Sequence, residues 1–336
     1  MSFLKIANTA TTAAFISRRD GETKLGEQLL LLPEDDWQNS LQQHKNKFVL
    51  LGIPEDIGVR ANNGIGGAHT LWEAALRAIC NVQSTPVLTG REIILLGWFD
   101  LAALMKQSET ADVHRLRELT AEVDEMVWPV IRSIVASGNI PVVIGGGHNN
   151  AYPLLKGSSL ASGTPVNCVN LDAHSDFRVL EGRHSGNGFR YAKHEGLLER
   201  YAMVALHENY NSAAIMADIT TSPDLHCSTF EDIFLRKLQS FEDACLRALR
   251  FTHGRPTGVE LDLDCIERTL SSAATPCGIT ALQARQYLHW CAQERKIAYL
   301  HLTEGAVQLR DGRTDATTGK LVAYLATDFM KSRLAE

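Results

Sequence analysis

Short apolar runs recur along the chain, and most are followed by a longer segment whose apolar residues repeat with helical spacing. Runs that are apolar at nearly every position are typical of parallel strands buried on both faces. The pattern predicts strands at 48–52, 92–97, 140–145, 166–171, 201–206, 258–264 and 297–303, with a weaker one at 225–229.

The segments between these strands carry the helical pattern. Regular alternation of strands and helices predicts an α/β fold, in which helices cover both faces of a parallel sheet. No repeat, low-complexity tract or linker interrupts the alternation. We therefore expect a single domain over 47–336, with 1–46 as an N-terminal extension or edge element. Helices are predicted at 68–80, 111–137, 150–160, 231–251, 280–294 and 318–334.

Composition narrows the class of protein. The net charge of −6 and the pI near 6.1 leave no basic footprint for nucleic acid, and they argue weakly against anionic membranes. Seven cysteines without a CxxC pair are typical of reduced thiols in a cytoplasmic protein. The N-terminus does not resemble a signal peptide, and no apolar run is long enough to span a membrane. We expect a soluble, cytoplasmic protein that acts on a small molecule.

Potential metal ligands gather where three of the expected strands end. In open parallel sheets, active sites lie beyond the carboxyl ends of the strands. Alternate residues of an extended chain point the same way, so the side chains at each strand end can converge on one point. The candidates are two histidines and four aspartates: His148, Asp172, His174, Asp176, Asp262 and Asp264.

This set suits two divalent cations better than one. A single six-coordinate ion that also binds water does not need six protein ligands, whereas two ions can share bridging carboxylates. Carboxylate-rich ligation favours manganese over soft metals, and a close pair of ions produces hydroxide at neutral pH. Taken singly, each motif is also compatible with a turn or a helix cap. Burying four carboxylates without cations would be very costly, so the motifs together predict a metal centre.

A nucleotide cofactor is not expected. The glycine-rich segment 64–69 follows the first strand but ends in His69, and no acidic residue closes a second strand about twenty residues later, as a dinucleotide fingerprint requires.

From residue 48 onward the chain resembles the ureohydrolase family, which includes arginase, agmatinase and formimidoylglutamase. The specific signals are the segments 172–176 (DAHSD) and 262–264 (DLD), supported by the turns at 52–58 and 278–280. The resemblance implies a three-layer α/β/α fold with an eight-stranded, mainly parallel sheet, two Mn²⁺ per chain, and a homo-oligomer, either a trimer or a hexamer. It assigns His148, Asp172, Asp176 and Asp262 to one ion, and Asp172, His174, Asp262 and Asp264 to the other.

Within that family the details are most similar to formimidoylglutamase. Glycine precedes Gly147-His148 where many arginases and agmatinases have aspartate, and Arg178 stands where arginases carry asparagine. The loop that begins with Ser185 and contains Asn187 is similar to that of formimidoylglutamases, whereas arginases place a proton-shuttling histidine at the position of Ser185. His184 is adjacent, however, and a shift of one residue would restore that histidine.

The resemblance implies hydrolysis of N-formimidoyl-L-glutamate to L-glutamate and formamide. Asp176 would orient and deprotonate the attacking water, and Glu304 would hold the amidinium nitrogen. Arg178 would bind a substrate carboxylate bidentately, while Ser185 and Asn187 would also contact substrate. An arginase- or agmatinase-like guanidino hydrolase with His184 as shuttle stays open as an alternative, as does a metal-retaining protein that has lost turnover.

Four further residues are weighed beside these. Glu260 departs from the family pattern, which has a small or hydroxyl residue there. His301 is expected to be a hydrogen-bonded core histidine. Arg183 and Arg190 could bind carboxylates, although a solvated surface charge is the commoner role for such residues.

Overall fold

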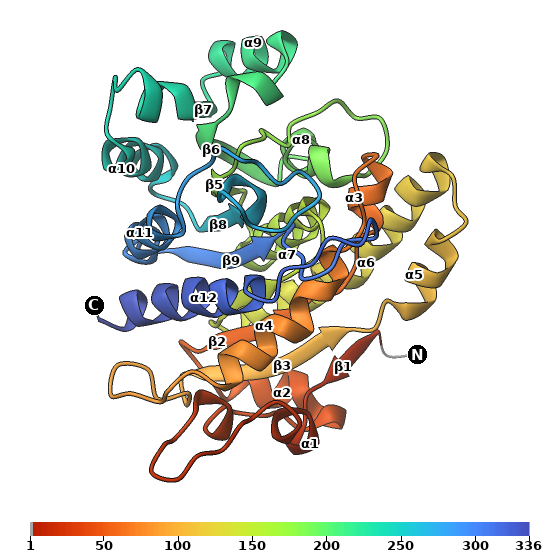
Figure 1. Cartoon of the computed structure of the whole chain (residues 1–336), viewed down its shortest axis with the longest axis vertical. Helices are drawn as coiled ribbons and strands as arrows, with labels where there is room; N and C mark the ends of the chain where they lie inside the picture. The colour runs from red at the N-terminus through yellow and green to blue at the C-terminus, as the bar shows by residue number, and fades with distance from the viewer. Residues whose placement is uncertain (1–2, 336) are drawn as a thin grey trace.

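A computed structural model describes residues 3–335 and contains one twisted sheet that runs through the molecule (Figure 1). The strand order is β1-β3-β2-β4-β9-β8-β5-β6-β7. The strands are β1 (Leu4–Ile6), β2 (Phe48–Gly52), β3 (Ile93–Phe99), β4 (Ile140–Ile144), β5 (Val166–Leu171), β6 (Leu198–Leu206), β7 (Leu225–Thr229), β8 (Thr257–Asp262) and β9 (Ile297–Thr303).

Eight of these strands, β2 to β9, are parallel, as predicted. The ninth, β1, pairs antiparallel with β3 at the edge, with Leu4 opposite Phe99. It has only three residues, which is too short for a recognisable alternation. Residues 3–46 therefore contribute an edge strand to the sheet that the rest of the chain forms.

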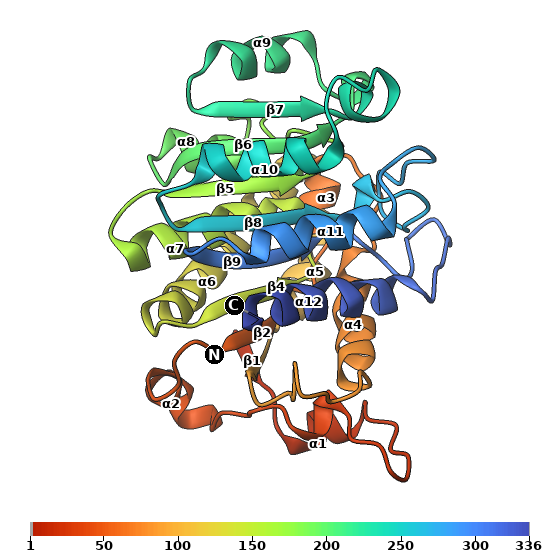
Figure 2. The same ribbon diagram turned by 90° about the vertical axis from the view of Figure 1, so that its left-hand side faces the viewer.

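Helices cover both faces of the sheet and complete the three layers (Figure 2). One apolar core lies between the sheet and α4, α10, α11 and α12, and the other between the sheet and α5, α6, α7 and α8. The helices are α1 (Thr9–Ala13), α2 (Trp37–Gln42), α3 (Ile57–Ala61), α4 (Leu71–Cys80), α5 (Ala102–Ser108), α6 (Val113–Ala136), α7 (Ala151–Ser162), α8 (Gly188–His194), α9 (Ala213–Thr221), α10 (Phe241–Thr252), α11 (Ala281–Ala292) and α12 (Thr318–Leu334).

The single helix predicted over 231–251 is wrong. A π-helical turn covers Glu231–Leu235, and α10 begins only after Ser240. Lys237 has a positive φ of 55°, which no α-helix accommodates, and the Ser240 hydroxyl accepts from the backbone N–H of Asp243 as a new N-cap. The chain therefore stops one helix and starts another within that segment.

None of the helices within residues 3–335 combines the length and apolar character that a bilayer crossing requires.

Candidate metal centre

The predicted ligands follow four strands that are neighbours in the middle of the sheet. In the order β4-β9-β8-β5, these strands run parallel and end at the same edge. His148 follows β4, Glu304 follows β9, Asp262 ends β8, and Asp172 follows β5. Segments more than 150 residues apart in the sequence thus bring their side chains to one place.

A glycine loop carries His148 to this edge. Gly145 and Gly146 have φ values of +89° and +76°, and a Cβ on Gly146 would lie 2.3 Å from the Asn150 amide nitrogen. Only glycine fits there without strain. The buried Glu55 fastens the loop from outside, since its Oε1 accepts from the Asn150 side chain at 2.7 Å. The two glycines and Glu55 therefore fix the position of His148.

The first cluster of ligands surrounds one nitrogen of the buried His148 ring. Its Nδ1 lies 2.8 Å from Asp176 Oδ2, 3.1 Å from Asp262 Oδ2 and 3.2 Å from Asp172 Oδ2. These four residues are the set that the family resemblance assigns to one ion, and their ligand atoms all lie within 4.8 Å of one another.

The second cluster shares Asp172 with the first. His174 Nδ1 lies 3.1 Å from Asp264 Oδ2 and 3.6 Å from Asp172 Oδ1. The two oxygens of Asp172 thus face the two histidines, which is the arrangement of a bridging carboxylate. Asp262, which the resemblance assigns to both ions, joins only the first cluster, and its Oδ1 accepts from the backbone N–H of Asp264 at 2.8 Å.

The chemistry of the donor set fits divalent cations. Within the described part of the chain, neither ring nitrogen of His148 nor Oδ1 of Asp264 has a hydrogen-bond partner, although all are buried. The ion pairs of the four aspartates are with these two histidines and with no lysine or arginine among residues 3–335. Buried carboxylates without positive partners are strongly unfavourable, so the residues present fit a site for cations.

Backbone strain marks two positions of the site. Asp176 and Glu304 have φ values of +45° and +63°, a backbone region that residues other than glycine seldom adopt. Strain of this kind persists where the surroundings enforce it, and it is concentrated at functional sites. Both residues line the cavity described below.

Glu304 is held against the metal ligands. Its Oε1 accepts from the backbone N–H of His148 at 2.9 Å, and 7% of the residue is exposed. Burial, together with the negative charges of Asp264 and Asp176, raises the pKa of Glu304 to about 8, although the hydrogen bond from His148 opposes the rise. A cation or cationic substrate beside this carboxyl would stabilise its ionised form.

A cavity of about 590 Å³ opens over the two clusters. Its lining includes Glu304 and four of the metal-ligand candidates, and its outer wall includes the predicted substrate residues Arg178 and Ser185. The Arg178 side chain is 54% exposed and lies 3.2 Å from Glu181, so it is free to exchange that partner for a ligand. The cavity lining also contains Arg190.

His184 and Asn187 lie outside this lining. The buried His184 ring accepts from the backbone N–H of Gly186 through Nδ1, and its Nε2 lies 3.2 Å from Glu181. Burial lowers the pKa of His184 to about 4 against the opposing effect of Glu181. The Asn187 amide is committed to the loop as well, because its Oδ1 accepts from Arg183 and from the His184 backbone.

The two remaining arginines are not solvated surface charges. Arg183 is buried and forms an ion pair with Asp124 of α6, with Nε 2.8 Å from the carboxylate. Arg190 donates to Asp218 at 2.7 Å and stacks over Phe177. Arg183 therefore supports the site loop, whereas Arg190 faces the cavity.

His301 is buried and hydrogen-bonded, which confirms the expectation of a core histidine. Its partner Glu260 also contributes to the site, which the sequence did not lead us to predict. Alternation in the segment 260–264 places Glu260 on the same strand face as Asp262, and this pattern could have identified it. Asn170 was missed in the same way, and its amide donates to Asp172 at 3.0 Å.

Several known proteins are similar in sequence to this chain. A profile described as the Arginase family matches residues 46–330. A formimidoylglutamase of Streptococcus pyogenes serotype M3 is 25% identical over 246 residues, 70% of this chain and 68% of that protein. A formimidoylglutamase of Nocardia farcinica is 25% identical over 296 residues, 84% of this chain and 86% of that protein.

Solved structures share the fold. A formimidoylglutamase from Bacillus subtilis superposes with a TM-score of 0.75 at 16% identity, covering 97% of this chain and 99% of that one. A formiminoglutamase from Trypanosoma cruzi with Mn²⁺ gives a TM-score of 0.72 at 20% identity, covering 94% and 99%. A hypothetical agmatinase from Burkholderia thailandensis gives 0.66 at 17% identity, covering 86% of each chain.

Proposed function

Because this chain belongs to the Arginase family and is a hydrolase of carbon–nitrogen bonds in linear amidines, we propose that it is a binuclear manganese enzyme that hydrolyses N-formimidoyl-L-glutamate to L-glutamate and formamide. The observation that carries the proposal is the convergence of two histidines and four aspartates at the ends of adjacent central strands. The names of the relatives support the choice of substrate.

His148, Asp172, Asp176 and Asp262 would hold one ion, and His174 and Asp264 would complete the other around the shared Asp172. When bound, the pair of ions supplies Lewis acidity and lowers the pKa of water. The protein's own side chains would orient the water, accept its proton and bind the substrate.

Asp176 lies beside His148 at the floor of the cavity and would orient the attacking water and accept its proton. Glu304, held rigidly by the His148 backbone, would bind the amidinium nitrogen and stabilise its positive charge. The strained backbone at both residues keeps these carboxylates in place without reorganisation.

The cavity wall suits the acidic end of the substrate. N-Formimidoylglutamate carries two carboxylates, and the lining contains two arginines, Arg178 and Arg190. A guanidinium fork binds a carboxylate through two parallel hydrogen bonds. We propose that Arg178 makes this contact, with Ser185 beside it; Asn187 would act by shaping the loop that carries them.

An arginase- or agmatinase-type guanidino hydrolase is the second candidate function. It would need His184 as a proton shuttle, but the His184 ring is bound to Gly186 and Glu181 outside the cavity lining. The placement of His184 therefore favours the formimidoyl substrate, whose carbon is more activated.

One assay panel tests both. The manganese-loaded protein is incubated with N-formimidoylglutamate, arginine and agmatine, and formamide, urea and ammonia are measured, with His184→Ala in parallel. We expect formamide from the first substrate, and activity of His184→Ala close to that of wild type. Urea release that falls about 10²–10⁴-fold in His184→Ala, the usual reach of general acid–base catalysis, would establish the guanidino reaction instead. No turnover of any substrate would point to a non-catalytic family member.

We also propose a homo-oligomer, a trimer or hexamer, from the resemblance to the family. Sedimentation velocity of the purified chain tests this; a monomer at micromolar concentration would contradict it.

A further inference from the structure

A row of buried polar residues runs across the sheet beneath the metal centre. Glu260 on β8 is paired in register with Asn170 on β5 and with His301 on β9. All three are completely buried. In each strand the residue two positions later, such as Asp262 after Glu260, shares the same face of the sheet. The row therefore lies directly below the ligands.

Glu260 is fixed by two neighbours on β9. Its Oε2 lies 2.6 Å from His301 Nδ1, and its Oε1 accepts from the Tyr299 hydroxyl at 2.7 Å. The other nitrogen of His301, Nε2, lies 3.4 Å from the carbonyl oxygen of Gly145, in the loop that carries His148. These contacts leave the Glu260 carboxylate no rotational freedom.

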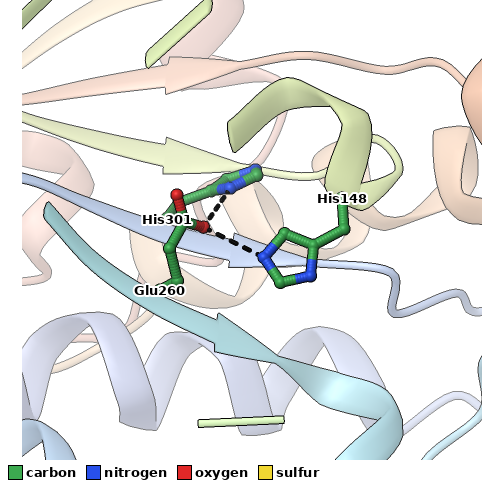
Figure 3. Close-up of side chains that lie close together, drawn as sticks. All are labelled: His148, Glu260 and His301. Atoms are coloured by element: carbon green, nitrogen blue, oxygen red, sulfur yellow. Dashed lines mark hydrogen bonds and ion pairs between the residues drawn. The ribbon is translucent and has the colours of Figure 1, made fainter. Parts of the chain in front are cut away.

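The same carboxylate oxygen faces the back of the His148 ring. His148 Nε2 lies 3.4 Å from Glu260 Oε2, and Figure 3 shows this oxygen between the two imidazole rings. At that distance the contact is electrostatic and slightly too long for a formed hydrogen bond. The ring presents Nδ1 to the aspartates on its opposite side.

The protonation of the imidazole ring explains what this contact can do. A neutral histidine that binds a cation through Nδ1 carries its proton on Nε2, and that proton needs an acceptor in a buried site. Ligating histidines commonly donate this proton to a carboxylate, which fixes both the tautomer and the ring orientation. Among residues 3–335, the acidic group within 4 Å of Nε2 is Glu260.

We propose that Glu260 is a positioning residue of the metal centre: held by His301 and Tyr299, it accepts the Nε2 proton of His148 and keeps Nδ1 turned toward the cation. It thereby strengthens binding of the ion that His148, Asp172, Asp176 and Asp262 would hold. The inference rests on the proposed binuclear centre.

The test is manganese affinity, measured by calorimetry in competition with a chelator, together with the electron paramagnetic resonance spectrum of bound Mn²⁺. Glu260→Gln keeps the shape of the side chain but removes its charge. We expect about 10–100-fold weaker binding at one of the two sites, as is typical for loss of such a partner. The spectrum at one equivalent per site should then lose the coupled-pair signal in favour of isolated ions.

Tyr299→Phe is the matched control. It removes one hydrogen bond to Glu260 but leaves both the charge and the contact with His148, so its effect on the metal is indirect and should lower the affinity by less than about tenfold. An equal loss in Tyr299→Phe and Glu260→Gln would overturn the proposal, because it would assign the effect to general packing.

A double-mutant cycle separates positioning from a merely structural role. If Glu260 acts through His148, then Glu260→Gln should change the affinity of that same site by less than about threefold once His148 is alanine, since the interaction no longer exists. The same loss in both backgrounds would overturn the proposal. Unchanged affinities in Glu260→Gln alone would overturn it as well.

A variant that does not fold and a wild type that binds no metal must be told apart from a failed inference. Should Glu260→Gln fail to fold, as judged by circular dichroism, Glu260→Asp is measured instead, since it keeps the charge but withdraws the carboxylate from His148; the same results support or overturn the inference. A wild-type protein that binds no manganese overturns the metal centre and this inference together. A wild type with two sites and a variant with the same affinities overturns only the inference.

Discussion

Asp262 ends β8 with its two oxygens committed to different partners. Oδ1 accepts from the backbone N–H of Asp264, and Oδ2 faces His148 Nδ1 at 3.1 Å. The backbone hydrogen bond explains why the side chain is held in place before any ion binds. No lysine or arginine pairs with the charge of this carboxylate in the described chain, so a bound cation would balance it.

We therefore expect Asp262→Asn to lose at least about 90% of its activity at saturating manganese, since even an indirect metal-site change costs about 10–100-fold. The amide keeps the shape and the Asp264 contact, so the fold should survive. Steady-state kinetics with metal content measured in parallel tests this, with the exposed Asp311→Asn as control. More than a tenth of wild-type activity would exclude Asp262 as a shared ligand.

Arg178 is a cavity-wall residue whose present partner, Glu181, is weakly held at 3.2 Å. In Arg178→Lys the charge remains but the two-pronged geometry is lost. We expect kcat/KM for N-formimidoylglutamate to fall by a factor that corresponds to about 1.5–3 kcal/mol, the value of a charge-assisted hydrogen bond. The manganese content should be unchanged. The exposed Arg313→Lys should have no effect. A loss of manganese in Arg178→Lys would place the residue in the metal site instead.

At the scale of elements, α6 supports the loop between β5 and α8 through one buried ion pair. Arg183 donates to Asp124 of α6, to Asn187 and to the carbonyl oxygen of Asn149, which follows His148. The aromatic rings of α7 and α8, Tyr152 and Tyr191, lie against its guanidinium. One side chain thus joins the loop that carries Ser185 to the loop that carries His148.

Arg183→Met should lower the free energy of unfolding by about 3–5 kcal/mol, because Asp124 is left buried without its partner. The double variant Arg183→Met/Asp124→Asn should recover part of this loss, since no lone charge remains. Urea unfolding of the metal-free protein, followed by tryptophan fluorescence, measures both. A double variant less stable than Arg183→Met would contradict the ion-pair explanation.

The same elements show what the sequence could and could not predict. The central strands match their predicted bounds closely, β5 and β9 at both ends, because burial on both faces requires an unbroken apolar run. The convergence of the candidate metal ligands was predictable because parallel strands end at one edge. The conformation of the Arg183 loop was not, since it depends on Asp124, which lies 59 residues away in the sequence.

For the molecule as a whole, Asp56 links α3 to two other segments, those that carry His69 and Arg310. This buried carboxylate at the start of α3 lies 2.8 Å from Arg60 Nε, 2.9 Å from His69 Nδ1 and 3.4 Å from Arg310 Nε. Burial raises its pKa, but the hydrogen bond from His69 and the charges of Arg60 and Arg310 more than offset this and lower the pKa to about 2.

A folded-state pKa below the unfolded value of about 4 stabilises the protein above that pH, and the contribution is lost as the pH falls toward 2. The shift corresponds to about 2 kcal/mol. We expect the metal-free wild type to exceed Asp56→Asn in stability at pH 7, with the difference shrinking between about pH 4 and 2. Denaturant unfolding across this range measures it; a constant difference would contradict the assignment to Asp56.

The balance of charges at the candidate metal centre predicts how many ions it binds. Four aspartates are gathered there against two histidines, and a neutral imidazole is the form that binds a cation. Two divalent ions would cancel the four negative charges, whereas one would leave a buried excess. Elemental analysis after manganese loading should therefore find two ions per chain.

Ions that bind only the folded state also stabilise it, by about 2.7 kcal/mol at a free concentration one hundred times the dissociation constant. Adding manganese to the metal-free protein should raise its melting temperature, and the chelator EDTA should reverse the rise. Because the candidate ligands lie at the ends of β4, β5 and β8, bound ions would tie the centre of the sheet together. One ion or fewer per natively folded chain would leave the convergence of these six side chains without a cation to explain it.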